Sequence, residues 1–328
     1  NFQFNQIFQD ILLNISTAYF VFYSTTSLLD AAQMDLKDAK AALDATQEKF
    51  SAGVQAKLDV LQAMAQYEKM VYQLESAKGN LKTSEGQLAN ALGFPAGTML
   101  NIMLPDKNVE FKIGAKTVSQ LIEEGLAKRP DIAAERATLA AKIAAIKAAK
   151  SDLWPKLNAD GTGTNDWYQY FGRHGLNYDT QHNYGYAAGA SVNWSVFEGF
   201  DTVSKIKAAE ADAKAEFENL RQTELSATAD VWEKYYAFVT ALRKLEASKA
   251  YLDASQGAYD LSMEGYKSGL KSILDVLNAE ADLSDSRSQV IKSRKELYTS
   301  FAQLVRATGT INERTDAARA QTGSTIEI

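Results

Sequence analysis

The sequence contains no cysteine and only four prolines in 328 residues. Without cysteine the chain can form neither a disulfide nor a thiolate metal site. It also lacks any run of about 18 apolar residues, the length that a membrane-spanning helix requires. The best candidate, Ala18 to Tyr23, is far too short, so we expect no transmembrane helix.

Clustered positive charge is missing as well. The 35 basic residues are interleaved with 41 acidic ones, and the net charge is −6. Because binding to nucleic acid draws on clusters of lysine and arginine, a nucleic-acid partner is not expected. At 46% apolar and 23% charged residues, the composition is that of a folded protein.

Motifs for chemistry are also absent. The sequence has no H-E-x-x-H, G-x-S-x-G or G-x-G-x-x-G pattern, so neither an enzyme nor a cofactor site is predicted. The only two histidines are His174 and His182, and Asp179 alone lies near them as a further ligand. A metal site needs more ligands than these, so none is predicted.

The proline positions divide the chain. All four prolines lie between Pro95 and Pro155, which leaves long proline-free regions on either side. These two regions repeat each other without a gap at a constant offset of 216 residues, the spacing from Gly53 to Gly269. The matched pairs include Tyr19 with Tyr235, Phe22 with Phe238, Leu58-Asp59-Val60-Leu61 with Leu274-Asp275-Val276-Leu277, and Leu88 with Leu304. The chain therefore contains an internal duplication.

Each copy predicts a helix, a tight glycine turn and a returning helix. The outgoing helix of the second copy is expected from about Asp201 to Met263, and at 1.5 Å per residue it would reach about 90 Å. The returning helices carry strict heptads, which indicate coiled-coil packing. These heptads are Leu74, Leu81 and Leu88 in the first copy and Val290, Leu297 and Leu304 in the second.

Between the copies the pattern changes. A short helix is expected from Val118 to Lys128, and a longer one from Pro130 to about Ser151, because proline suits the first helical turn. After Pro155 apolar residues alternate with polar ones, which predicts two strands joined by a loop at about 171–183. Aromatic residues gather between Trp154 and Phe200. The pattern fits either strands of a membrane β-barrel or a soluble edge hairpin.

The order of these elements resembles the TolC family of outer-membrane efflux proteins. The strings Ala127 to Ile132 and Leu153 to Leu157 resemble the family's entry into its second β-hairpin, and Val192 to Gly199 resembles the exit. Both Gly-x5-Asp-Val-Leu turns resemble the family's periplasmic tips. The family has an earlier helix and a first β-hairpin, so we expect such a segment before Asn1. Three copies of the present stretch alone would supply half the strands of the family's twelve-stranded barrel.

The resemblance implies a mainly α fold with a β-hairpin. Long coiled-coil helical hairpins in two structural repeats would form an α-barrel, and the strands would contribute to a trimeric outer-membrane β-barrel. The expected segments are a first periplasmic helical hairpin (1–93), an equatorial mixed region (94–130), a helix leading to the membrane (131–152), the β-hairpin of the barrel (153–200), a second periplasmic helical hairpin (201–309) and a C-terminal tail (310–328).

The function that the resemblance implies is passive conduction. A homotrimer in the lipid of the bacterial outer membrane would extend into the periplasm. It would receive substrates from an inner-membrane pump or ABC transporter through a periplasmic adaptor protein, in either efflux or type I secretion. The alternative is a soluble coiled-coil scaffold or interaction protein, which would have no reason to carry an alternating, aromatic-rich hairpin between its repeats.

The duplicated acids Asp59 and Asp275 are the main candidate site residues. Ser272 and Asp275 form the pattern of a helix capping box, whereas the first copy has Ala56 at the cap position. The resemblance assigns Asp59, Asp275 and Asn278 to a constriction at the periplasmic entrance, where gathered carboxylates would attract cations.

The resemblance also implies links that hold the entrance closed, made by Asp59, Tyr266 and Lys271. Lysine lacks the planar fork of arginine, so a link through Lys271 should be less directional. Gly53 and Gly269 are expected to adopt a positive φ. The tips around them would be the surface for an adaptor, formed by Ser51, Gly53, Val54 and Gln55 in the first copy and by Lys267, Gly269, Leu270 and Lys271 in the second.

Overall fold

The computed structural model describes residues 2–103, 111–112, 116–171, 178–311 and 326–327. The chain forms two compact units. The first unit contains residues 1–133 and 223–328, and the second contains residues 134–222. One helix, α5 (Asp201–Lys267), contributes residues to both.

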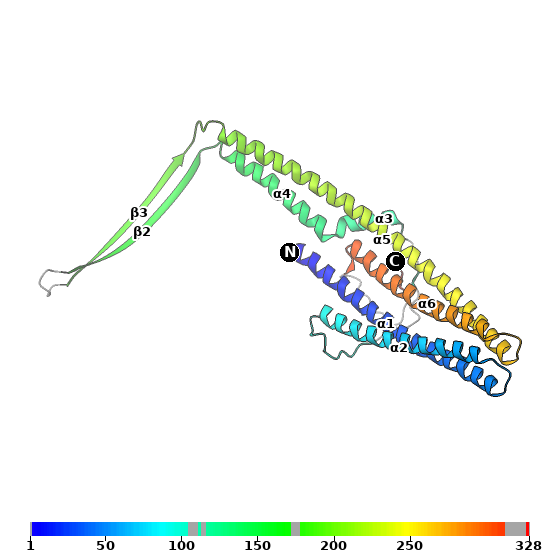
Figure 1. Ribbon diagram of the computed structural model, residues 1–328. Coiled ribbons are helices and arrows are strands. Elements are labelled where there is room, and N and C mark those ends of the chain that lie inside the picture. Colours follow the sequence, from blue (N-terminus) through cyan, green and yellow to red (C-terminus); the bar gives the residue numbers. More distant parts are fainter. Residues whose placement is uncertain (1, 104–110, 113–115, 172–177, 312–325, 328) are drawn as a thin grey trace. The chain divides into compact units, whose positions relative to one another are not determined.

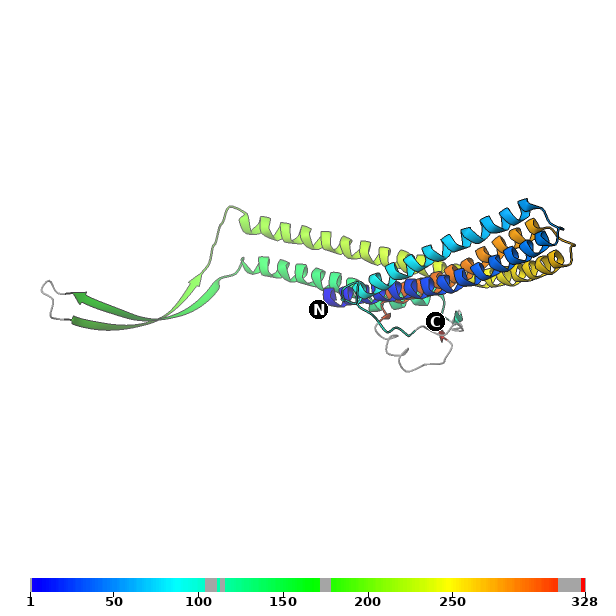
Figure 2. The ribbon, with the colours of Figure 1, turned by 60° about the horizontal axis from the view of Figure 1, so that its bottom comes forward.

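The first unit is built from two helical hairpins. Helix α1 (Phe2–Ser51) returns as α2 (Lys57–Ala91), and the later part of α5 returns as α6 (Ile273–Ala307). Both turns lie at the same end of the unit, with the helices side by side (Figures 1 and 2). The expected fold class, mainly α with repeated long hairpins, is confirmed. Helix α5 continues one turn beyond the expected end at Met263.

The heptad residues of the second copy form part of the core between α5 and α6. Val290, Leu297 and Leu304 are buried against Phe238 and Leu245. In the first copy Leu88 is buried, but Leu74 and Leu81 are only half-buried within a single chain. The same heptad pattern is thus fully buried between α5 and α6 but only partly buried on α2.

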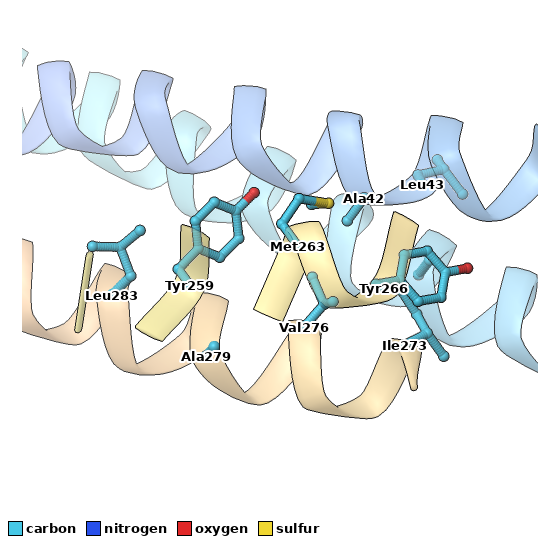
Figure 3. Packing of buried hydrophobic residues seen from close by; sticks show 10 residues of the cluster. Ala42, Leu43, Tyr259, Met263, Tyr266, Ile273, Val276, Ala279 and Leu283 are labelled. Atoms are coloured by element: carbon cyan, nitrogen blue, oxygen red, sulfur yellow. The ribbon is translucent and has the colours of Figure 1, made fainter. Parts of the chain in front are cut away.

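A second cluster fills the half of the unit that lies nearer the turns. Tyr259, Met263 and Tyr266 project from α5 towards α1, where they meet Ala42 and Leu43 (Figure 3). Helix α6 completes the cluster with Ile273, Val276, Ala279 and Leu283. Small alanines on α1 opposite large aromatics on α5 allow the two hairpins to approach closely.

A buried arginine organises the region where the short helices begin. Helix α3 (Val118–Lys128) and helix α4 (Pro130–Ser151) are separated only by Arg129. Its guanidinium donates to Asp131 at 2.8 Å and to Asp230 of α5 at 2.7 Å. The Lys-Arg-Pro-Asp string therefore has a structural role, because it ties the start of α4 to the long helix.

The second unit carries the β-hairpin. Strand β2 (Lys156–Phe171) pairs antiparallel with β3 (Tyr178–Asn193), with Lys156 opposite Asn193 and Trp167 opposite His182. The expected loop at 171–183 was too long, because β3 already begins at Tyr178. The stretch from Tyr178 to Asn183 has no apolar alternation, so periodicity could not identify it as a strand.

The two faces of this hairpin differ in chemistry. Successive side chains of a strand point to opposite faces, and directly paired residues share a face. One face is mainly apolar and the other mainly polar. The apolar face carries Leu157, Ala159, Gly161, Tyr184, Tyr186, Ala188, Ala190 and Val192, and the polar face carries Lys156, Asn158, Asp160, Thr162, Thr164, Asn183, Ser191 and Asn193.

Two very short strands complete the described structure. Strand β1 (Phe111–Lys112) pairs parallel with β4 (Ile326–Glu327). None of the described helices contains an apolar stretch long enough to cross a membrane.

Candidate functional site

The two hairpin tips have the same backbone geometry. Gly53 and Gly269 adopt φ angles of 74° and 82°, in the left-handed region that favours glycine. In the first tip the Val54 N–H donates to the Lys49 carbonyl at 3.1 Å, and in the second the Leu270 N–H donates to the Gly265 carbonyl at 2.8 Å. These bonds satisfy carbonyls at the helix ends, as in the common glycine-terminated cap. The expected positive φ is confirmed at both positions.

The tips expose most of the residues expected to form a docking surface. Ser51, Gly53, Val54, Lys267, Gly269, Leu270 and Lys271 are exposed, whereas Gln55 is half-buried. Val54 and Leu270 are large apolar residues that face solvent at matching positions of the two copies. Of the two expected docking stretches, 51–55 and 267–271, only the second contains lysines, namely Lys267 and Lys271. The two tips therefore have the same backbone shape but a different charge.

Asp275 is held by the capping box that the sequence predicted. Its carboxylate accepts from the Ser272 backbone N–H at 2.9 Å and from the Ser272 hydroxyl at 2.8 Å. These hydrogen bonds, and the nearby charge of Lys271, lower the pKa of Asp275. The carboxylate is therefore ionised, but its hydrogen-bonding capacity is partly used at the helix start. Asn278, one turn further along α6, is exposed.

Asp59 occupies the equivalent place without a capping serine. The N-cap residue Ala56 makes no side-chain cap hydrogen bond. Instead the side-chain amide of Gln55 donates to Asp59 Oδ2 at 2.6 Å. The two duplicated acids thus have different partners. Asp59 is bound by Gln55, a residue of the same tip that was expected to belong to the docking surface.

Tyr266 joins the two hairpins through residues that the sequence analysis did not identify. Only 1% of its surface is exposed, and its hydroxyl donates to Thr46 Oγ1 at 3.0 Å. The ammonium of Lys49 lies 4.2 Å from the centre of the Tyr266 ring and also donates to the Tyr266 carbonyl. Within one chain Tyr266 is therefore bound to α1 rather than to Asp59 or Lys271. Thr46 and Lys49 lie about one turn apart on α1, a spacing that could have indicated a shared partner.

A charged layer connects the hairpins further from the tips. Arg287 of α6 contacts Asp35 at 2.6 Å and Asp38 at 2.8 Å, both on α1. The side chains of Arg287 and Asp35 are only 13% and 7% exposed. Ser284 also donates to Asp35 at 2.7 Å. This layer fixes the register of α6 against α1.

The described residues contain no group of three or more side chains that could bind a metal ion. His182 instead stacks on Trp167 and Tyr184, with ring centres 6.2 and 6.3 Å apart. His174 and the side chain of Asp179 lie outside what the structure describes.

The comparison with protein families gives a match over most of the chain. Residues 3–94 and 121–310 match the family model described as outer membrane efflux protein. The chain belongs to this family. Membership confirms the resemblance to outer-membrane efflux proteins, the expected location in the outer membrane with an extension into the periplasm, and the expectation that the chain is not an enzyme. It sets aside the soluble scaffold.

Individual relatives agree with this assignment. The chain is 28% identical over 134 residues to Nodulation protein T of Rhizobium leguminosarum bv. trifolii. The aligned stretch covers 41% of this chain and 28% of that protein. It is 25% identical over 251 residues to Outer membrane protein TolC of Escherichia coli strain K12, which covers 74% of this chain and 49% of TolC. The chain thus spans about half or less of these relatives.

Solved structures show the same fold. The outer-membrane channel OprN superposes with a TM-score of 0.78 at 21% identity, over 94% of this chain and 68% of that one. The Neisseria gonorrhoeae MtrE outer membrane channel in its open state superposes with a TM-score of 0.75 at 20% identity, over 94% of this chain and 68% of that one.

Proposed function

We propose that three copies of this protein form an outer-membrane pore that continues as a tunnel through the periplasm. The observation that supports this most strongly is the pairing of two kinds of unit in one chain that belongs to an outer-membrane efflux family. One unit consists of long helical hairpins suited to side-by-side packing, and the other carries a two-faced β-hairpin.

The β-hairpin has the properties that a barrel strand pair needs. Each strand has 16 residues, which exceeds the roughly 9 to 11 that cross a bilayer at the usual tilt. Its apolar face, with Tyr184 and Tyr186, would contact lipid, and its polar face would line the pore. This supports the membrane alternative over the soluble edge hairpin.

We place the periplasmic entrance at the hairpin tips. In a trimer, Asp59, Asp275 and Asn278 would recur around the threefold axis, and the gathered carboxylates would attract cations. Because Asp275 accepts two hydrogen bonds from Ser272 whereas Asp59 accepts one from Gln55, we assign more of the selectivity to Asp59. The closed-state links would then have two parts. Tyr266 holds the hairpins of one protomer together, and the exposed Lys271 reaches the Asp59 of a neighbouring hairpin.

The partners follow from the same arrangement. The six tips of a trimer, each with an exposed apolar residue, would receive a periplasmic adaptor protein at Ser51 to Gln55 and at Lys267 to Lys271. An inner-membrane pump or ABC transporter would deliver the cargo. Efflux of small molecules and type I secretion would use the same conduit, since the pump selects the cargo.

Cell fractionation tests the proposal. We expect the protein in the outer-membrane fraction, extracted only with detergent and with the mass of a trimer once the detergent is subtracted. Release into aqueous buffer as a monomer would contradict it. Pull-down of a crosslinked adaptor, compared between the wild type and a variant with Leu270→Asp, then tests the tip surface, because the charge should abolish capture without altering the mass.

A further inference from the structure

Glu280 is a buried acid at the contact between the two hairpins. It lies on α6 about two turns from the second tip and is only 2% exposed. Its Oε1 accepts from the side-chain amide of Gln66 on α2 at 3.2 Å. Among the residues that the structure describes, Glu280 forms no ion pair. A buried carboxylate without a positive partner is costly, so such groups tend to hold a proton instead.

Two buried side-chain oxygens, one on α6 and one on α2, lack a donor. Glu280 Oε2 and the side-chain carbonyl of Gln62 are both buried and accept no hydrogen bond. Gln62 precedes Gln66 by one helical turn, so the two amides lie on the same face of α2. Two unpaired acceptors are unfavourable. A proton on Oε2 would turn one acceptor into a donor, and the O–H could then bond to Gln62.

The charged surroundings also favour the neutral acid. Asp35 and Asp38 face Glu280 from α1, Lys69 from α2 and Tyr259 from α5, while Arg287 on α6 is engaged by the two aspartates. Burial is the main cause that raises the pKa of Glu280 to about 7. The hydrogen bond from Gln66 opposes this rise, the charges of Asp38 and Asp35 add to it, and the charge of Lys69 has the smallest, lowering effect.

We propose that Glu280 is a proton-binding site that controls the contact between the two hairpins. With the proton bound, its carboxylic acid joins α6 to both Gln62 and Gln66 on α2. When the proton leaves, the carboxylate is repelled by Asp35 and Asp38 and turns towards water, which loosens α6 from α2. Acid therefore tightens the contact and alkali loosens it.

Only the second copy contains this site. The duplication places Met64 of α2 at the position equivalent to Glu280, and Met64 is exposed. The proton site is therefore specific to the second copy, and it acts between the copies, through Gln66 of the first, rather than within each one.

The absence of cysteine makes a distance measurement straightforward. Spin labels are attached to Ala65→Cys on α2 and Ala281→Cys on α6, both exposed, and labelled protein is diluted with unlabelled protein to suppress distances between protomers. We expect a short, narrow distance at about pH 5 and a longer, broader one at about pH 9. The Glu280→Gln variant should keep the short distance at both pH values. An unchanged wild-type distance, or the wild-type response in Glu280→Gln, would overturn the proposal.

Two controls complete the experiment. Glu264→Gln removes an exposed acid of α5 and should leave the pH response intact; loss of the response would assign it to general surface charge. Glu280→Met keeps the volume without a titrating group, so it should also lose the response and serves if the glutamine variant does not fold. Infrared difference spectra should contain a protonated carboxylic acid band that disappears in Glu280→Gln, and persistence of the band would refute the assignment.

Discussion

Replacement of Arg287 by glutamine tests how strongly the two hairpins are held together. Arg287 is the only cation in direct contact with both Asp35 and Asp38 among the described residues, and it spans from α6 to α1. The substitution keeps a polar side chain of moderate length but removes the charge. Asp35, with 7% of its side chain exposed, would then be left buried beside a second carboxylate.

The expected cost is a few kcal/mol. Two unit charges 4 Å apart attract by about 4 kcal/mol at an effective dielectric constant of 20. Removing one partner of a buried pair typically costs about 3 to 5 kcal/mol. Because the Asp38 side chain is 24% exposed and can be hydrated, we expect the lower end, about 3 kcal/mol.

Guanidinium titrations followed by far-UV circular dichroism measure this loss. Arg287→Gln should lower the apparent unfolding free energy by about 3 kcal/mol, and adding Asp35→Asn should recover about 2 kcal/mol because asparagine needs no counter-charge. The control Lys292→Gln, at an exposed position of the same helix, should change stability by less than about 0.5 kcal/mol. If Arg287→Gln is no worse than Lys292→Gln, or if Asp35→Asn adds to the damage, the reasoning about a buried charged layer is wrong.

Three further predictions concern the tips and the proton site. The native state keeps the proton of Glu280 above the usual pKa of 4.5, so the stability that this proton contributes is present in acid and is lost as pH rises through about 7. In the same titrations, the unfolding free energy of Glu280→Gln relative to that of the wild type should therefore rise by about 3 kcal/mol between about pH 4.5 and pH 8. Gly269→Ala should cost about 1 to 2 kcal/mol through backbone strain alone, since a Cβ there meets no atom within 4 Å and φ is +82°; a neutral result in thermal unfolding would contradict this. Lys271→Glu should raise the single-channel conductance in bilayers, and an unchanged conductance would disprove the link to Asp59.

Much of the fold could be predicted because its determinants are local or repeated. The glycine turns, the capping box at Ser272 and the proline at the start of α4 are each encoded within a few residues. The constant offset between the copies showed that both hairpins share one design. The length of β3 could not be predicted, because backbone pairing continues through Tyr178 to Asn183 without an apolar alternation.

The partners of the site residues were less accessible from the sequence. Tyr266 was identified from its place beside the second tip, but its contacts with Thr46 and Lys49 join residues more than 200 positions apart. Glu280 occupies an ordinary position in a helix that is rich in charge. Only the packing of α2 against α6 reveals that it is buried, so its proton-binding role depends on tertiary structure.

The ion selectivity of single channels tests the proposed function most directly. The purified protein is inserted into planar bilayers, and the reversal potential is measured across a potassium chloride gradient. A trimeric pore with Asp59 at its entrance predicts discrete, cation-selective channels whose selectivity falls in Asp59→Asn and much less in Asp275→Asn. A protein that reaches the outer membrane yet forms no channels, or forms anion-selective ones, would contradict this account.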